Sequence, residues 1–194
     1  MGKEEMWIKV QNAQTIAIGG HVRPDGDCVG SCMALYQYLT KVFPEKEIDV
    51  FFETMPNQFA SLFSKVSYQI GFEKARKTYD LFFALDCGDK ERLGDGAKVF
   101  ENAKDTICID HHISNVGYAA LNFIEPQSSS ASEVLYELLD DTKIDSDVAT
   151  ALYLGIAHDT GVFKYSCTSK RTMEIAGALI AKGIDINTLL DQTF

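Results

Sequence analysis

The chain has 194 residues, 46% of them hydrophobic, and a formal net charge of −10. That length fits one large domain or one and a half small ones, with ample apolar content for a core. A chain this acidic lacks the basic face of a protein that coats duplex nucleic acid, and no apolar run reaches the roughly 18 residues of a membrane helix. The charge still allows a phosphate substrate where divalent cations add positive charge.

The cysteines and the start of the chain bear on its compartment. Five cysteines are scattered along the sequence with no CxxC pair. We interpret all five as reduced residues in the core or near a site, with small hydrophobic packing as the better interpretation for Cys28 and Cys87. The first five residues are charged and lack the apolar stretch of a signal peptide behind them. We therefore expect a cytoplasmic protein.

Strand and helix patterns alternate in the first half of the chain. Short β-prone runs end in polar residues, and apolar residues at helical spacing separate these runs. The predicted strands are residues 15–20, 48–52 and 81–85, and the predicted helices are residues 5–13, 28–42 and 57–63.

The same alternation continues in the second half. A polar loop and helix over 89–103 precede a central strand, Thr106–Ile109, which runs into Asp110-His111-His112. The further predicted elements are an outer strand at 122–124 and helices at 131–139, from Ser146 or Asp147 as the N-cap to Asp159, and at 168–182. This order predicts an α/β fold: a doubly wound, mostly parallel sheet with helices on both faces.

Acids and imidazoles gather at four predicted strand or helix ends. These include all four histidines of the chain: His21 with Asp25 and Asp27, then Asp86, then Asp110 with His111 and His112, and finally His158 with Asp159. Each segment alone also fits a solvated turn, a polar strand end or a helix C-terminus. In open α/β sheets, however, sites are built at the carboxyl ends of the strands, so we expect these groups to converge.

The chemistry of this set favours metal ions. Converging carboxylates repel one another and stay ionised only with cations between them. Oxygen ligands mixed with imidazole suit Mn²⁺, Mg²⁺ or Co²⁺ better than structural zinc. There are enough ligands for two ions, and two metals about 3.5–4 Å apart are the usual device for in-line attack on phosphorus.

Four stretches, in this order, resemble the motifs of the DHH phosphoesterase superfamily. They are HVRPDGDCVGS, ALDCGDKERLG, IDHH followed by SN, and HDTGVFKYS. The superfamily includes RecJ-type exonucleases, manganese-dependent pyrophosphatases, cyclic-di-AMP phosphodiesterases and nano-RNases. The chain is most similar to the bifunctional oligoribonucleases and 3′-phosphoadenosine-5′-phosphate (pAp) phosphatases, a likeness that rests on Arg92, the SSSASE segment and FKYSCTSKRT.

The resemblance implies a role for each residue of the set. It places His21 and Asp25 on one metal, Asp27, His111 and Asp159 on the other, Asp86 as the bridge, and His112 against the substrate phosphate. Asp86 and His112 are thus the expected catalytic residues. Asp110 is expected to orient a neighbouring histidine. His158 departs from the family pattern and is expected to support the metal ligands or the fold without binding a metal itself.

Four further residues carry two interpretations each. Arg92 and Asn115 are candidate substrate contacts, with support of their own loops as the alternative. Ser130 and Ser132 are expected to be helix caps rather than ligand contacts.

The implied function is hydrolysis of phosphoester bonds in short oligonucleotides or pAp. Two divalent cations, most often Mn²⁺ in the family that the chain resembles, would activate a water for this reaction. The alternatives are a cyclic-dinucleotide phosphodiesterase, an inorganic pyrophosphatase or a non-catalytic metal- and nucleotide-binding module. We expect residues 1–194 to form one catalytic domain, without the family's C-terminal substrate-binding domain and its GGGH-like motif. We expect a small nucleotide or a short oligonucleotide as the substrate, and neither a long nucleic-acid duplex nor a membrane as a partner. The sequence leaves open whether the protein forms a homodimer.

Overall fold

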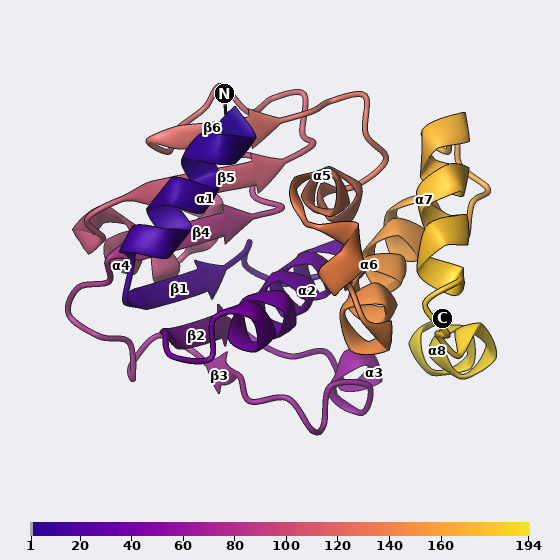
Figure 1. The fold of residues 1–194 in the computed structure, drawn as a ribbon, viewed down its shortest axis with the longest axis horizontal. Coiled ribbons are helices and arrows are strands. Elements are labelled where there is room, and N and C mark those ends of the chain that lie inside the picture. The colour runs from indigo at the N-terminus through magenta and orange to yellow at the C-terminus, as the bar shows by residue number, and fades with distance from the viewer. Residues whose placement is uncertain (1) are drawn as a thin grey trace.

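The computed structural model describes residues 2–194, and its centre is a six-stranded sheet with the order β3-β2-β1-β4-β5-β6. Every neighbouring pair is parallel, so the carboxyl ends of the strands share one edge, toward which the arrowheads point in Figure 1. The strands are β1 (Thr15–Gly19), β2 (Glu47–Phe52), β3 (Gln69–Ile70), β4 (Leu81–Leu85), β5 (Thr106–Asp110) and β6 (Leu121–Ile124).

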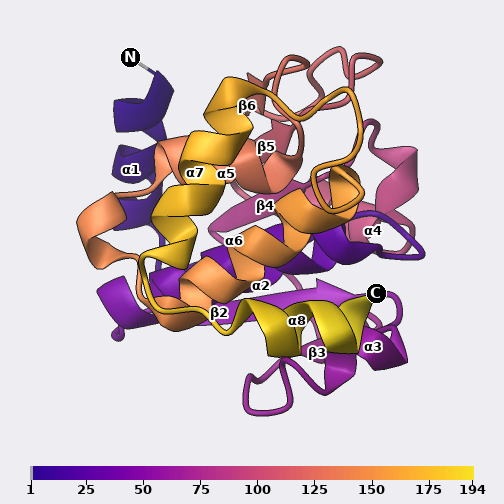
Figure 2. The same ribbon diagram turned by 90° about the vertical axis from the view of Figure 1, so that its right-hand side faces the viewer.

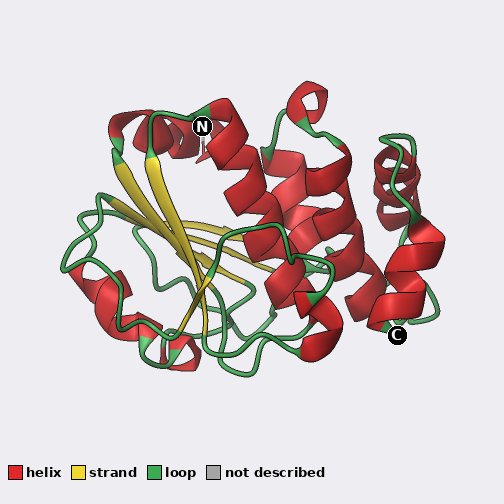
Figure 3. Ribbon diagram, turned by 90° about the horizontal axis from the view of Figure 1, so that it is seen from below, coloured by secondary structure: helices red, strands yellow, loops and turns green. Residues whose placement is uncertain are grey.

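Helices cover both faces of this sheet, as Figure 3 shows. They are α1 (Gly2–Asn12), α2 (Gly26–Val42), α3 (Asn57–Ala60), α4 (Gly96–Asn102), α5 (Ala131–Leu138), α6 (Ser146–Asp159), α7 (Lys170–Ile180) and α8 (Ile186–Thr193), with short 3₁₀ turns at Glu91–Leu93 and Asp141–Lys143. Helices α1, α2 and α5 contact one face and α4 the other, while α6 packs outside α2 and α5 and α7 packs on α6. Helix α8 lies beside α3 (Figure 2). The predicted doubly wound α/β fold is confirmed.

The strand sequences explain why both faces need covering. All five residues of β4 are buried, and successive side chains point to opposite faces. Phe83 and Leu85 enter the core beneath α2 and α5, whereas Phe82 and Ala84 enter the smaller core beneath α4. Such continuous apolar strands are typical of a parallel sheet buried on both sides.

Close packing of α2 against α6 depends on two glycines. A Cβ on Gly30 would lie 2.5 Å from the Ala151 carbonyl oxygen of α6, and a Cβ on Gly155 would lie 2.5 Å from Asp27 Oδ1 of α2. Any larger residue would therefore push the helices apart. The tight crossing brings the end of α6, at Asp159, close to the start of α2.

Several predicted boundaries differ from the structure. Neither Ser146 nor Asp147 is the N-cap of α6: Asp145 is, because its carboxylate accepts the backbone N–H groups of Asp147 and Val148 at 3.2 and 3.1 Å. The two-residue strand β3 was not predicted, since two residues show no periodicity. None of the helices within residues 2–194 combines the length and apolar character needed to cross a membrane.

Candidate metal centre

The site lies where the strand order reverses direction. The chain leaves β1 for β2 on one side and later returns to β4 on the other, so the carboxyl ends of β1 and β4 border a crevice. Ligands in open α/β sheets bind at such switch points. His21 follows β1, Asp86 follows β4, and His111 follows β5.

Asp86 stands at the centre of the cluster. Its Oδ2 lies 3.4 Å from His21 Nε2, and its Oδ1 lies 3.6 Å from His111 Nε2. The carboxylate thus offers one oxygen to each half of the site. Asp86 is 2% exposed, and its Oδ1 has no hydrogen-bond partner among residues 2–194. A buried carboxylate oxygen without a donor is costly, so this oxygen calls for a cation.

The first half of the site comes from β1 and the start of α2. His21 Nδ1 donates to the Val22 carbonyl at 2.8 Å, which leaves Nε2 facing Asp86 and, at 3.7 Å, Asp25 Oδ1. Asp25 is also the N-cap of α2, since its Oδ1 accepts the N–H groups of Asp27 and Cys28. One residue thereby starts the helix and presents a carboxylate to His21.

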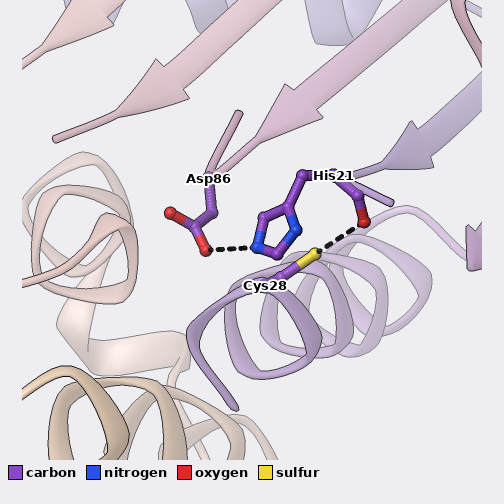
Figure 4. Close-up of side chains that lie close together, drawn as sticks. All are labelled: His21, Cys28 and Asp86. Atoms are coloured by element: carbon purple, nitrogen blue, oxygen red, sulfur yellow. Dashed lines mark hydrogen bonds and ion pairs between the residues drawn. The ribbon is translucent and has the colours of Figure 1, made fainter. Parts of the chain in front are cut away.

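Cys28 lies beside this half of the site as an uncharged side chain. Figure 4 shows the His21 ring directed at Asp86, while the Cys28 thiol lies 3.9 Å from the His21 carbonyl oxygen. Burial raises the pKa of this thiol well above its ordinary value, so it remains protonated. Its position matches the packing role expected from the sequence.

The second half of the site contains Asp27, His111 and Asp159. His111 Nε2 lies 3.1 Å from Asp159 Oδ2 and 4.0 Å from Asp27 Oδ2. Asp27 is fully buried, and its two oxygens accept the N–H groups of Ala131 and Ser132 at 2.6 and 3.0 Å. The N-terminus of α5 therefore holds this carboxylate in place, with its helix dipole favouring the negative charge.

Asp110 orients His112. The fully buried Asp110 accepts the His112 Nδ1–H at 2.7 Å and the Asn115 side-chain amide at 2.7 Å. Asn115 Nδ2 also lies 3.3 Å from the Cys87 carbonyl oxygen, and its Oδ1 accepts the Gly117 N–H. The buried Asn115 thus supports its loop, and His112 keeps Nε2 free on a half-buried ring.

Charge within the cluster shifts the pKa values of its members. Burial alone would lower the pKa of His21, but hydrogen bonds to Asp25 and Asp86 raise it to about 11. In the same way, Asp159 and the nearby carboxylates outweigh burial and raise the pKa of His111 to about 9. Burial and the repulsion between carboxylates raise the pKa of Asp27, and burial raises that of Asp86. The histidine protons therefore neutralise the acids when no cation is present.

The residues present fit divalent cations. Donor atoms within 4.8 Å of one another occur in several sets, including Asp86 with His111 and His112, and Asp27 with His111 and Asp159. The donors of these two sets are carboxylate oxygens and imidazole nitrogens, which suit Mn²⁺, Mg²⁺ and Co²⁺. Together with the orphaned Oδ1 of Asp86, this donor set is what a cation site requires.

The other predicted residues lie around this centre. Arg92 is exposed, its backbone oxygen accepts the Val22 N–H at 2.7 Å, and its guanidinium makes no ion pair within the described part of the chain. Ser130 caps α5 by accepting the Glu133 N–H, as expected, whereas the buried Ser132 hydroxyl has no partner in the described part of the chain and is not a cap. Ser132 acts instead through its N–H, which holds Asp27.

Sequence reasoning missed the turn after Asp159. Gly161, Val162 and Phe163 have φ of 55°, 55° and 63°, three successive left-handed residues. The buried Thr160 hydroxyl accepts the Phe163 N–H at 3.0 Å and donates to the Ile156 carbonyl at 2.6 Å. The Thr-Gly pair directly after Asp159 indicates a turn, but nothing in the sequence predicts that Val162 and Phe163 adopt a left-handed conformation.

A family model described as "DHH family, N-terminal domain" matches residues 15–156. The chain belongs to the DHH family. It is 30% identical over 188 residues to the "Probable bifunctional oligoribonuclease and PAP phosphatase NrnA" of Streptococcus mutans, covering 95% of this chain and 58% of that protein. It is also 30% identical over 204 residues to the "Bifunctional oligoribonuclease and PAP phosphatase NrnA" of Bacillus subtilis, covering 99% of this chain and 61% of that protein. The chain therefore spans about three fifths of the length of these relatives.

Solved structures show the same DHH fold. An exopolyphosphatase-related protein from Bacteroides fragilis superposes with a TM-score of 0.90 at 24% identity, covering 100% of this chain and 60% of that one. A putative family II inorganic pyrophosphatase from Methanococcus jannaschii gives a TM-score of 0.69 at 20% identity, covering 91% and 60%. At these identities the likeness establishes the fold, and the chemistry has to be argued from the site. The resemblance read from the four motifs is confirmed.

Proposed function

We propose that this chain hydrolyses phosphoester bonds in short oligonucleotides and in 3′-phosphoadenosine-5′-phosphate, using two divalent cations, with Mn²⁺ preferred. The observation that supports it most is Asp86, whose two oxygens face different histidines and one of which is buried without a donor. The proposed ligands are His21, Asp25, Asp27, Asp86, His111 and Asp159. When bound, the cations supply positive charge for the phosphate oxygens and Lewis acidity toward water.

The chain's own residues prepare this site for a phosphate. His21 Nε2 and His111 Nε2 point inward because their surroundings fix both rings. The hydrogen bond to Asp110 raises the pKa of His112, which favours the protonated form of this ring. With Nδ1–H donated to Asp110, the other N–H, at Nε2, can stabilise a phosphate oxygen or pass a proton to the leaving oxygen. His112 is thus the proposed acid, and Asp110 its positioning residue.

The substrate class rests on the relatives and on charge. The two curated relatives are named for activity on oligoribonucleotides and PAP. A net charge of −10 does not favour affinity for a long phosphate backbone, which Lys and Arg normally supply. The exposed Arg92 guanidinium, near the loop that carries His21, is the proposed contact for a second phosphate.

An assay with defined metals tests this function. Purified chain is stripped with a chelator, dialysed, and given Mn²⁺, Mg²⁺, Co²⁺ or Zn²⁺ with a dinucleotide, pAp, cyclic-di-AMP or pyrophosphate. We expect Mn²⁺ to give the highest rate, with the dinucleotide and pAp hydrolysed in preference to the other two. Preference for cyclic-di-AMP or pyrophosphate would refute the substrate class.

Two variants give the assay its controls. Asp86→Asn keeps the shape of the side chain but removes its charge, so hydrolysis should fall by about a hundredfold or more. Glu45→Gln removes an exposed charge that makes no ion pair within residues 2–194 and should retain full activity. Full activity in excess chelator, or in Asp86→Asn, would contradict the cation mechanism.

A further inference from the structure

His158 is the histidine whose position the proposed function leaves unexplained. One of its ring nitrogens lies within 4.8 Å of a carboxylate oxygen of Asp25 and of one from Asp159, and these two oxygens also lie within 4.8 Å of each other. Asp25 belongs to the first half of the metal centre and Asp159 to the second. His158 therefore lies beside one carboxylate from each half of the centre.

The ring is held in place by apolar packing. It lies edge-on to Phe59, with centroids 5.7 Å apart, and tilted against Phe194 at 5.4 Å. Its other contact is Gly26, where a Cβ would come within 2.3 Å of the ring. The imidazole thus sits directly against the backbone that joins Asp25 to α2, and a side chain at position 26 would displace it.

Within the described residues, no hydrogen bond or ion pair holds the ring of His158. Each of the other three imidazoles makes a close hydrogen bond or ion pair: His21 with the Val22 carbonyl, His111 with Asp159, and His112 with Asp110. Within residues 2–194, His158 makes neither, although two carboxylates stand within ligand reach. A partly buried ring that is fixed by packing and has free nitrogens is ready to act as a ligand.

We propose that Asp25, His158 and Asp159 form a third cation position at the rim of the centre, for a first-row transition-metal ion. One imidazole and two carboxylates form a donor set that Zn²⁺ and Mn²⁺ accept, whereas Ca²⁺ takes oxygen ligands. The side chain of Asp25 is 46% exposed, so this position opens to solvent. Its ion therefore binds more weakly than the two enclosed by Asp86 and exchanges first.

This third position goes beyond the two-ion hydrolysis proposed above and can be tested apart from it. Titration calorimetry and elemental analysis of the intact chain with Zn²⁺, and separately with Mn²⁺, should show three ions, the last one weakest. His158→Phe keeps an aromatic ring between Phe59 and Phe194 but removes both nitrogens. In this variant the third ion should bind at least about tenfold more weakly, with the two tighter ions unchanged.

A second variant and a spectrum separate ligation from packing. Phe59→Leu alters the support of the ring without removing a donor and should keep the third ion. With Co²⁺, the third equivalent should change the visible absorption of the wild-type chain and of Phe59→Leu, but not that of His158→Phe. Only two ions in the wild type, or a third ion that binds His158→Phe equally well, would overturn the proposal. Because both readouts count ions, a chain that hydrolyses no phosphoester would refute the proposed function and leave this position intact.

Discussion

Metal binding should release protons from the histidines of the centre. Without cations, His21 has a pKa raised to about 11 and His111 a pKa raised to about 9, so both carry a proton at neutral pH. A metal ligand must be a neutral imidazole, so each cation displaces a proton. Lowering the pH therefore weakens cation binding. Raising the pH strengthens it, until the pH passes about 9 for His111 and about 11 for His21.

The size of the effect follows from these pKa values. A pKa of about 9 lies two units above pH 7, and each unit corresponds to about 1.4 kcal/mol, so the His111 proton costs about 3 kcal/mol to displace. The same reasoning gives about 5.5 kcal/mol for His21. The apparent affinity at each position should thus rise about tenfold per pH unit between pH 6 and 8. Asp27 and Asp86, whose pKa values are also raised, can only add to the release.

Calorimetry measures this release directly. Mn²⁺ is titrated into stripped protein at pH 7.5 in three buffers that differ in ionisation enthalpy, and the slope of the observed enthalpy gives the protons released. We expect at least about two protons for the two ions, and one fewer for His111→Ala. Glu45→Gln should match the wild type. An affinity that stays flat from pH 6 to 8, or heats that do not depend on the buffer, would refute the assignment of these histidines as ligands.

Three further substitutions test how the site is supported. Asp110→Asn should lower kcat by about ten- to a hundredfold while leaving the number of bound ions unchanged, because His112 loses its charged partner. Gly155→Ala places a Cβ 2.5 Å from Asp27 Oδ1, so calorimetry should show a cation bound at least about tenfold more weakly. Thr160→Val leaves the Phe163 N–H without its acceptor, and urea unfolding should show a loss of about 1–3 kcal/mol.

Most of the fold could be predicted because its signals are local. The strands β1, β4 and β5 are short apolar runs with polar residues at their ends, and α2 shows apolar residues at helical spacing with an acid at its start. Once the sheet is parallel, the carboxyl ends of these strands must share an edge. The meeting of His21, Asp86 and His111 follows from that geometry.

Other features of the site depend on contacts between distant segments. Asp27 accepts N–H groups from Ala131 and Ser132, more than a hundred residues further along the chain. No periodicity in the sequence predicts that the start of α5 meets the start of α2. For the same reason the ring of His158 could be given only a general supporting role: the sequence does not show that it packs on Gly26.

The backbone at Asp86 shows why its carboxylate lies between two histidines. A strand continued at ordinary dihedral angles would send this side chain to one face of the sheet, but Asp86 has a φ of 51°. Aspartate tolerates this left-handed conformation better than most residues, at a cost of roughly 1–2 kcal/mol. The conformation is retained because the Asp86 N–H donates to the Ile109 carbonyl at 3.0 Å, which ties the turn to β5. The same turn carries the carboxylate between His21 and His111, so local strain at the end of β4 places one carboxylate against both halves of the proposed centre.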